Sequence, residues 1–491
     1  MATVDTSWYE LIGDPRMKKK IVNCRTYACA LSLEEVKEVR IECPAPMTKA
    51  SYAIKDRAGN TVKEGHFELS KEGVNEFGVK ELLPFEELMP YETENAGYSL
   101  EMGVTLISGD ELSGARVFKC NLHAGKTSAN IPTTNLPEAL KAIPVAKPGM
   151  TEDELRQICV DYMKLQTQFR YKLEGDYNYV VESQMLPRTL KAGVVYGGLP
   201  YISRGAGNLY RAAEFYNPET GALDINGDIF EDYRLLGNAC SGGACTSWAR
   251  VVTSAYLGYT MFLAQANGFL PVGPYRYSKP EVTRFIKKRI DPNGYSCEDI
   301  CQENGEQTMF ESYAMMKLAD GVGCNGHVRM NTAIPVVIRN EDGTIDGDKS
   351  YTLMTEQICY VNNPNCLRIA EDGSHYTCQG FVDIKYSFRD LYNTNYIPFT
   401  FAEFIDPSKV EKAVVRLSVE PELKMEVISS NYPISDVFCE TNGKKYVFRN
   451  LEFFRKEVKM CDIFPEEALV GDVKVSVRLY NGETYELDTR R

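Results

Sequence analysis

The sequence has little of the dense positive charge that nucleic-acid binding requires. Of its 491 residues, 55 are Lys or Arg and 68 are Asp or Glu, which gives a formal net charge of −13. Basic residues gather only in two short runs, at 18–20 and 287–289. Because a nucleic-acid site needs Lys and Arg clusters that displace counterions from phosphates, we expect no nucleic-acid partner.

The chain also lacks a long hydrophobic run and a visible export signal. Its most apolar window, residues 251–272, is interrupted by Thr253, Ser254, Gln265 and Asn267. A membrane-spanning helix needs ~18–20 consecutive apolar residues, so we expect no membrane span. The first residues include no apolar segment of the secretory type. We therefore expect the 15 Cys to be reduced thiols in a cytoplasmic protein.

Motifs that hold metal ions or nucleotide phosphates are missing as well. The cysteines form no paired C-x-x-C knuckles, and no G-x-x-x-x-G-K-[ST] loop occurs. Residues 224–228 resemble part of a calcium-binding loop, but no Glu stands at the position that would close it. We expect no bound metal and no cofactor.

What the sequence does contain is three stretches of different patterning. Apolar and charged residues alternate early in the chain, as at Val39, Ile41 and Cys43, which is typical of an antiparallel sheet with one wet face. After a Pro-rich stretch, Thr151 and Glu154 form a capping box that opens an amphipathic helix. We expect an antiparallel β domain over 1–130, a Pro-rich linker over 131–150, a mixed domain over 151–405 and a second mainly β domain over 406–491.

The 4 His leave few candidates for a general base. We expect His66 on a strand surface, His123 near the end of the first domain and His375 in a polar turn, and we interpret all three as structural. His327 differs, because it follows Gly326 and opens an apolar stretch.

A second informative segment begins at Cys240, after a Gly237-Asn238-Ala239 turn. Apolar residues recur from 244 to 263 at spacings of three and four, and Gly268 follows, so we expect a long buried helix from about Cys240. A Cys in the first turn meets unpaired N–H groups and the positive end of the helix dipole, which favour the nucleophilic thiolate. Cys245 lies one turn further along the buried stripe, and we interpret it as a core thiol.

Four segments occur in order along the chain: Tyr196-Gly197-Gly198-Leu199-Pro200-Tyr201, Asn238-Ala239-Cys240-Ser241-Gly242, Leu318-Ala319-Asp320-Gly321-Val322 and Gly326-His327-Val328-Arg329-Met330. Together they resemble landmarks of the NlpC-type cell-wall peptidases. The resemblance covers about residues 150–400 and implies a papain-like fold that cleaves amide bonds in peptidoglycan stem peptides. By this resemblance Cys240 matches the nucleophile and His327 the base, while Ala239 stands where the family usually has Asp.

A papain-like site also needs a third polar group that orients the imidazole. In the resembling family this group lies on the strand after the His strand, which here corresponds to residues 351–357. Glu356 and Gln357 are both candidates, on opposite faces of that strand, and we favour Gln357 slightly. We expect Tyr201 either to place its hydroxyl near the oxyanion or the substrate amide, or to be a core aromatic. The helix start at Ser241 is expected to supply N–H groups for the oxyanion.

We hypothesise an α+β papain-like (NlpC-type) catalytic core flanked by two mainly β domains. It would act as a cysteine amidase or peptidase that hydrolyses a peptide or muropeptide substrate through Cys240 and His327. Without a visible export signal the substrate would be cytoplasmic, whereas the resemblance also allows action at the cell wall. Two alternatives stay open: an acyltransferase or transglutaminase-like use of the same pair, and a non-catalytic binding protein, which the missing Asp at position 239 suggests.

Overall fold

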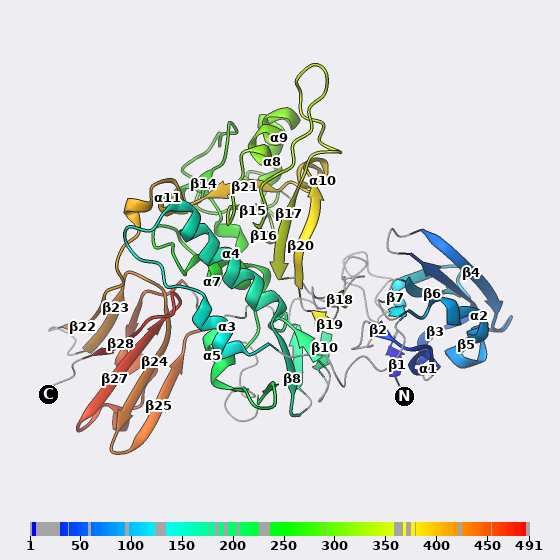
Figure 1. Ribbon diagram of the computed structural model, residues 1–491, viewed down its shortest axis with the longest axis horizontal. Coiled ribbons are helices and arrows are strands. Elements are labelled where there is room, and N and C mark those ends of the chain that lie inside the picture. Colours follow the sequence, from blue (N-terminus) through cyan, green and yellow to red (C-terminus); the bar gives the residue numbers. More distant parts are fainter. Residues whose placement is uncertain are drawn as a thin grey trace.

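Three separate hydrophobic cores follow one another along the chain. The first consists of buried residues between 33 and 122, the second of residues between 136 and 410 together with Tyr480, and the third of residues between 413 and 479. In Figure 1 the first sheet lies at one end of the molecule, the helix-rich part in the middle and the last strands at the other end. The architecture is mixed α/β with mostly antiparallel sheets.

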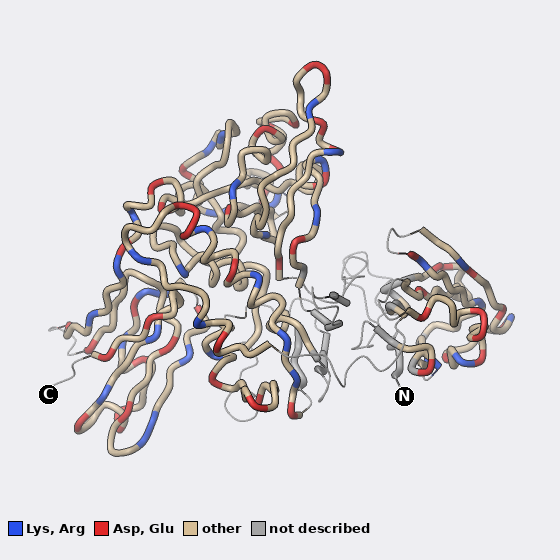
Figure 2. Tube along the Cα trace, viewed as in Figure 1, with Lys and Arg blue, Asp and Glu red and all other residues tan. Residues whose placement is uncertain are grey.

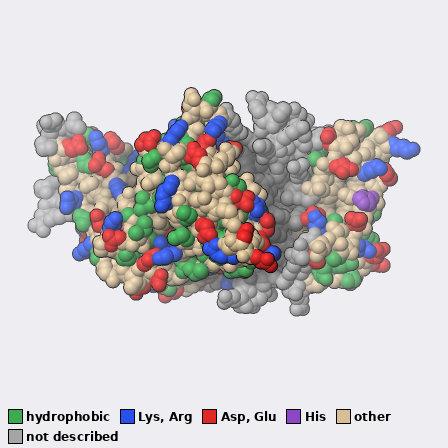
Figure 3. All heavy atoms as spheres, turned by 90° about the horizontal axis from the view of Figure 1, so that it is seen from above, with side chains coloured by type: hydrophobic (Ala, Val, Ile, Leu, Met, Phe, Trp, Pro, Cys, Tyr) green, Lys and Arg blue, Asp and Glu red, His purple; other side chains and the backbone are tan. Residues whose placement is uncertain are grey.

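The computed structural model describes residues 2–5, 30–37, 39–56, 60–93, 98–122, 134–175, 177–181, 186–190, 195–202, 205, 207–224, 236–288, 290–357, 367–369, 375–378, 380–420, 425–452 and 454–487. Along this part of the chain, Lys and Arg are interspersed with Asp and Glu (Figure 2). On the face seen in Figure 3, hydrophobic side chains are scattered among charged ones. The charged residues of both signs are therefore spread along the described part of the chain.

The first core lies against a seven-stranded sheet. Its strands run in the order β1 (Ala2–Asp5), β3 (Val39–Lys55), β6 (Tyr98–Leu106), β7 (Glu111–Leu122) and β2 (Ala30–Leu31), with β4 (Thr61–Glu68) and β5 (Val74–Gly78) also paired to β3. Short helices α1 (Leu33–Val36) and α2 (Phe85–Leu88) accompany the sheet. The predicted alternation is confirmed on β3, because Val39, Ile41 and Cys43 are buried whereas Arg40 between them is half-buried. His66 on β4 is exposed, as expected for a strand-surface residue.

The longest helix of the described part is α4 (Glu152–Gln168), with 17 residues. Its predicted capping box is confirmed: the Thr151 N–H donates to Glu154 Oε2 at 2.8 Å, and the Glu154 N–H donates to the Thr151 hydroxyl. One face, which includes Ile158 and Tyr162, is fully buried in the second core. Among the described residues, no helix combines the length and the apolar character needed to cross a membrane.

A six-stranded antiparallel sheet carries the candidate residues. Its order is β14 (Leu270–Pro271), β21 (Ile397–Thr400), β15 (Gly321–Cys324), β16 (His327–Asn331), β17 (Tyr351–Gln357) and β20 (Gly380–Ser387). Helices α4 and α7 (Cys240–Trp248) pack against β16 and β17 (Figure 1). Helices α8 (Cys297–Asn304), α9 (Glu306–Ala314) and α10 (Phe388–Asn393) pack near β15, β20 and β21. Short helices α3 (Leu136–Ala142) and α11 (Ala402–Ile405) complete this part.

A second sheet of the middle part has the order β12 (Tyr216–Asn217), β13 (Ala222–Leu223), β8 (Arg170–Leu173), β11 (Val195–Gly197), β19 (His375–Cys378) and β18 (Leu367–Ile369). Beside it, β9 (Tyr177–Val181) and β10 (Leu186–Leu190) form an antiparallel pair. The interpretation of His375 as a turn residue is wrong. Its backbone pairs with Ile369, so His375 belongs to strand β19, which runs antiparallel to β18.

The predicted long helix from Cys240 is also wrong in its extent, because α7 ends at Trp248. The buried carboxylate of Glu403, on α11, accepts the N–H groups of Thr253 at 2.6 Å and Ser254 at 2.8 Å. These N–H groups would otherwise continue the helical ladder. Of the predicted apolar positions beyond residue 250, Val251, Val252, Ala255 and Leu263 are buried, whereas Tyr259 and Phe262 are half-buried. Gly268 ends a short 3-10 turn with φ of 92°.

The third core lies between two sheets. One has the order β22 (Val415–Glu420), β23 (Met425–Ser430) and β26 (Glu457–Lys459), and the other β25 (Lys444–Arg449), β24 (Ile434–Thr441), β27 (Val473–Leu479) and β28 (Thr484–Leu487), with α12 (Met460–Ile463) between β26 and β27 in the chain. Buried ion pairs join this part to α5 (Leu209–Glu214). Arg211 Nε lies 2.8 Å from Asp436 Oδ1, and Arg478 contacts the other oxygen of Asp436 at 2.5 Å. Although burial opposes ionisation, the arginines hold the pKa of Asp436 well below its usual range.

Candidate active site

The site begins at the N-terminus of α7. Ala239 is the N-cap residue, with extended backbone angles and no side chain that can accept the first N–H groups of the helix. The segment before the helix is fixed by two backbone bonds: the Asn238 N–H donates to the Pro200 carbonyl at 2.9 Å, and the Ile202 N–H donates to the Asn238 carbonyl at 3.0 Å. Cys240, the first helical residue, is therefore held at a helix end whose N–H groups lack a capping side chain.

Gln166 on α4 fixes the position of α7. Its side-chain amide donates to the Ser247 hydroxyl at 2.6 Å, and its carbonyl accepts from Asn238 Nδ2 and from the Thr246 hydroxyl, both at 3.2 Å. All four residues are fully buried. The sequence analysis missed this network, because nothing local to residue 166 indicates which helix it meets.

His327 is the first residue of β16, directly after Gly326, whose φ is 139°. The Cys240 sulfur lies 4.0 Å from the Gly326 carbonyl oxygen. Burial of the imidazole disfavours its charged form, but the charges of Cys240 and Glu356 and hydrogen bonds to both raise the pKa of His327 to about 10. His327 is therefore positively charged at neutral pH.

The thiol of Cys240 responds to the same neighbours. Burial raises the pKa of a thiol, but the charge of His327, a hydrogen bond to it, and the backbone N–H groups of Ser241 and Val328 together lower the pKa of Cys240 below its ordinary value. The arrangement therefore favours a thiolate–imidazolium pair, in which the thiolate is the nucleophilic form.

Glu356 completes the line of charges from the other side of the imidazole. It is fully buried on β17, where its Oε2 contacts His327 Nε2 and accepts from Arg329 Nε at 3.0 Å, while its Oε1 accepts from the Tyr386 hydroxyl. Although burial opposes ionisation, these partners lower the pKa of Glu356 to about 2. Because Glu356 contacts Nε2 of the His327 ring, Nδ1 is the ring nitrogen left for Cys240.

The preference for Gln357 as the orienting residue does not match this geometry. Gln357 is fully buried, its amide donates to the Leu199 carbonyl at 2.5 Å, and its Cβ lies against Gly243 of α7. Neighbouring strand residues face opposite sides of a sheet, so only one of the pair can meet His327. A register shift between Met354 and Glu356 sets which one it is, and the sequence does not reveal that shift.

The two remaining site candidates lie beside the start of α7. Tyr201 is half-buried and its backbone forms a parallel bridge with Asn238, two residues before Cys240. Ser241 is buried, and its backbone N–H helps to lower the pKa of Cys240. Gly198, in the same segment as Tyr201, has φ of 80°, and a Cβ there would lie 2.3 Å from the Thr167 carbonyl oxygen. Glycine is thus required for this segment to reach the helix start.

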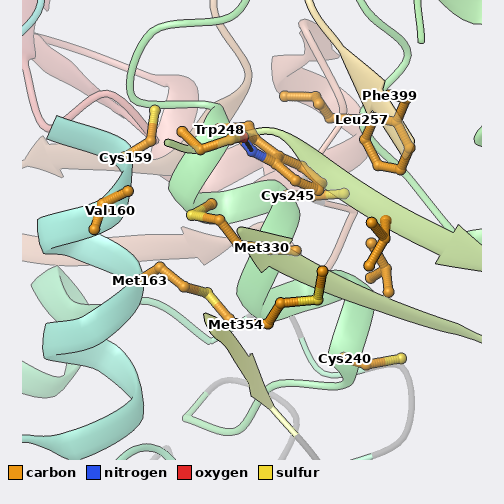
Figure 4. Packing of buried hydrophobic residues seen from close by; sticks show 14 of the residues in the cluster. Cys159, Val160, Met163, Cys240, Cys245, Trp248, Leu257, Met330, Met354 and Phe399 are labelled. Atoms are coloured by element: carbon orange, nitrogen blue, oxygen red, sulfur yellow. Dashed lines mark hydrogen bonds between the residues drawn. The ribbon is translucent and has the colours of Figure 1, made fainter. Parts of the chain in front are cut away.

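Cys245 is a core thiol, as predicted. It is fully buried, lies 3.4 Å from the Gly258 carbonyl oxygen, and burial raises its pKa well above the ordinary value. Figure 4 shows it among Trp248, Met330 and Phe399, whereas Cys240 lies at the other end of the helix with its sulfur directed away from these residues. The two cysteines of one helix therefore have opposite environments.

The 318–322 segment is structural. Arg156 on α4 donates to Asp320 at 2.7 Å and to the Leu318 carbonyl at 2.6 Å, and all of the Asp320 side chain is buried. Burial raises the pKa of Asp320. This ion pair ties α4 to the beginning of β15, and it does not extend to Cys240.

The structure gives no metal site in the residues it describes, where no group of His, Cys, Asp and Glu is arranged to hold an ion. Within residues 224–228, the stretch that resembles a calcium loop, only 224 lies inside the described part, and His123 lies outside it. Gly321, Gly323 and Gly326 form a G-x-G-x-x-G pattern, but it lies in the β15–β16 hairpin and does not open a helix as a dinucleotide-binding loop does.

Comparisons with known proteins assign no family to the chain. No family model matches it, and no curated protein matches it. Among solved structures, a tetra-tandem repeat in the extending region of a large adhesion protein aligns over 95% of this chain and 96% of its own, with 10% identity and a TM-score of 0.11. A TM-score this low carries no argument about fold.

Proposed function

We propose that the protein is a cysteine amidase or peptidase in which Cys240 is the nucleophile, His327 the acid and base, and Glu356 the group that orients His327. The observation that supports this most is the row of groups from buried Cys240 through half-buried His327 to fully buried Glu356. A thiol with a lowered pKa beside an imidazole with a raised one is the arrangement that cysteine hydrolases require.

In the first step the Cys240 thiolate attacks the amide carbonyl carbon, and the carbonyl oxygen becomes an oxyanion. The N–H groups of the first turn of α7, beginning with Ser241, lack a capping side chain and can stabilise that charge. His327 gives its proton to the leaving amine, and a thioester to Cys240 remains. Ala239 has no side chain that could accept these N–H groups, so they are left available to the oxyanion.

In the second step a water molecule attacks the thioester. Acylation has removed the thiolate charge that helps to raise the pKa of His327, so the imidazole can now be neutral and take a proton from the water. Collapse of the intermediate releases the carboxylic acid and regenerates the thiolate. Throughout, Glu356 holds the ring in one orientation and stabilises its charged form.

For the substrate class and the architecture we rely on the resemblance of the four segments to NlpC-type peptidases. We propose a papain-like core that acts on peptidoglycan-derived peptides, in the cytoplasm or at the cell wall. An amine in place of water would make the same site an acyltransferase, and product analysis with added amines distinguishes the two outcomes.

The test is the pH dependence of alkylation at each cysteine. Native protein is treated with limiting iodoacetamide from pH 5 to 9, and each Cys is quantified by peptide mass spectrometry in the wild type and in His327→Ala. An ordinary thiol titrates near ~8.5, so we expect Cys240 to react at pH 5–6 and to lose that reactivity in His327→Ala. Buried Cys245 and exposed Cys461 are controls within the same chain. Ordinary titration of Cys240 in the wild type would refute the proposed catalytic pair.

A further inference from the structure

Arg329 lies directly behind Glu356, between two tyrosine rings. The centre of its guanidinium is 3.9 Å from the ring centroid of Tyr386 and 4.3 Å from that of Tyr396. Its Nε donates to Glu356 Oε2, the oxygen that also contacts His327, and the side chain is largely buried. Arg329, His327 and Tyr386 therefore occupy both oxygens of Glu356.

Cys240, His327, Glu356 and Arg329 form a row of charges whose signs alternate. With Cys240 as thiolate and His327 protonated, the signs run minus, plus, minus and plus from Cys240 to Arg329. Without Arg329 the buried row would carry a net negative charge, and burying uncompensated charge is strongly unfavourable. The response that costs the least free energy is protonation of the Glu356 carboxylate or of the Cys240 thiolate. Protonation of Glu356 would abolish its ion pair with His327.

The two rings restrict the guanidinium to one plane. Stacking on aromatic faces is favourable for Arg, and its flat fork can hold a carboxylate oxygen in a fixed direction, which the round ammonium of Lys cannot do. The Tyr396 ring also meets the imidazole of His327 edge to face, with centroids 6.3 Å apart. Both tyrosines thus confine Arg329, and Tyr396 also borders His327.

We propose that Arg329 is a positioning residue that keeps Glu356 ionised and aimed at His327, and so maintains the Cys240–His327 pair in acidic solution. This inference rests on the proposed function. The titratable groups facing Glu356 are His327 and Arg329 from β16 and Tyr386 from β20, with Tyr396 next to Arg329 and Cys324 of β15 hydrogen-bonded to Tyr396. Of these, only Arg329 is a permanent cation.

The test uses the alkylation profile of Cys240 extended down to pH 4, in Arg329→Gln and Arg329→Lys. We expect Arg329→Gln to move the acidic limit of Cys240 reactivity upward by about one pH unit or more, which is about a tenfold loss of reactivity at any pH below both limits. Arg329→Lys keeps the charge and should shift the limit less, in the same direction. Buried Cys245 serves as the control for folding, because it stays unreactive as long as the fold is intact. If Cys245 becomes reactive in Arg329→Gln, the inference is judged from the profile of Arg329→Lys alone.

A double-mutant comparison separates positioning from general structural damage. In a Glu356→Gln background the carboxylate cannot ionise, so adding Arg329→Gln should not shift the profile further. Two results overturn the inference but leave the proposed function in place. One is a Cys240 alkylation profile that is unchanged in both Arg329 variants. The other is a shift of that profile by Arg329→Gln that is equal with Glu356 and with Gln at position 356. A wild-type Cys240 without His327-dependent reactivity at low pH would instead overturn the proposed function.

Discussion

Replacement of Glu356 by Gln should destabilise the middle part of the protein in a pH-dependent way. Glu356 is fully buried and bonded by His327, Arg329 and Tyr386. Although burial opposes ionisation, these partners lower its pKa to about 2, from an ordinary value of 4.5. The difference of about 2.5 (4.5 − 2), at about 1.36 kcal/mol per unit, corresponds to about 3 kcal/mol of folding free energy at pH 7. Breaking a buried ion pair by removing one partner costs a similar ~3–5 kcal/mol.

The sign of the pH dependence follows from the direction of the shift. A carboxylate with a lower pKa in the folded state stabilises that state above its unfolded pKa, and the stabilisation is lost as the pH falls through the folded pKa. The linkage relation gives about 3 kcal/mol at pH 7 and about 1 kcal/mol at pH 3. The difference in unfolding free energy between wild type and Glu356→Gln should therefore shrink by more than half over this range.

Tryptophan fluorescence provides the assay. The chain has 2 Trp, and Trp248 is fully buried in the second core. In a Trp8→Phe background, urea unfolding followed by fluorescence therefore reports on the part of the protein that contains Glu356. If wild type and Glu356→Gln differ in unfolding free energy by the same amount at pH 7 and at pH 3, the ionised carboxylate is not the source of the stability.

Three further outcomes are expected. Gln357→Ala should keep the low-pH reactivity of Cys240 but lower the stability of the Trp248 core by ~1 kcal/mol, because one buried hydrogen bond, to Leu199, is lost; loss of the reactivity would assign Gln357 a role in the site. Asp436→Asn should destabilise the third core by ~3–5 kcal/mol in thermal unfolding, because Arg211 and Arg478 lose the buried carboxylate of Asp436, whereas the matched change at the exposed Glu214 should cost much less. Amide hydrolysis should fall above pH 10, because His327, with a pKa of about 10, loses the proton that the leaving amine needs; a rate that keeps rising in a pH–rate profile would contradict this.

The features that were predicted correctly depend on residues close together in the chain. The capping box at Thr151 and Glu154 involves a spacing of three, and the helix start at Cys240 follows directly from a Gly/Asn turn and an apolar repeat. The buried state of Cys245 follows from the same repeat. Local spacing therefore sufficed for helix starts and for burial.

What the sequence did not reveal depends on partners far away in the chain. The early end of α7 is caused by Glu403, about 150 residues beyond the two N–H groups that it accepts. The choice of Glu356 over Gln357 depends on a strand irregularity and on Arg329 and Tyr386 from neighbouring strands. No spacing rule encodes such contacts, because they arise only when the sheet is assembled.

The ion pairs between Arg211 and the last sheet determine how the chain can be divided. A fragment ending near residue 410 would leave Arg211 without Asp436 and would remove Tyr480 from the second core. Such a fragment would expose an apolar surface and a formerly paired cation together, which favours aggregation. The shortest fragment expected to fold with Cys240 in place therefore extends from about residue 134 through Leu487, and the sheets beyond residue 410 belong to the folding unit of the site.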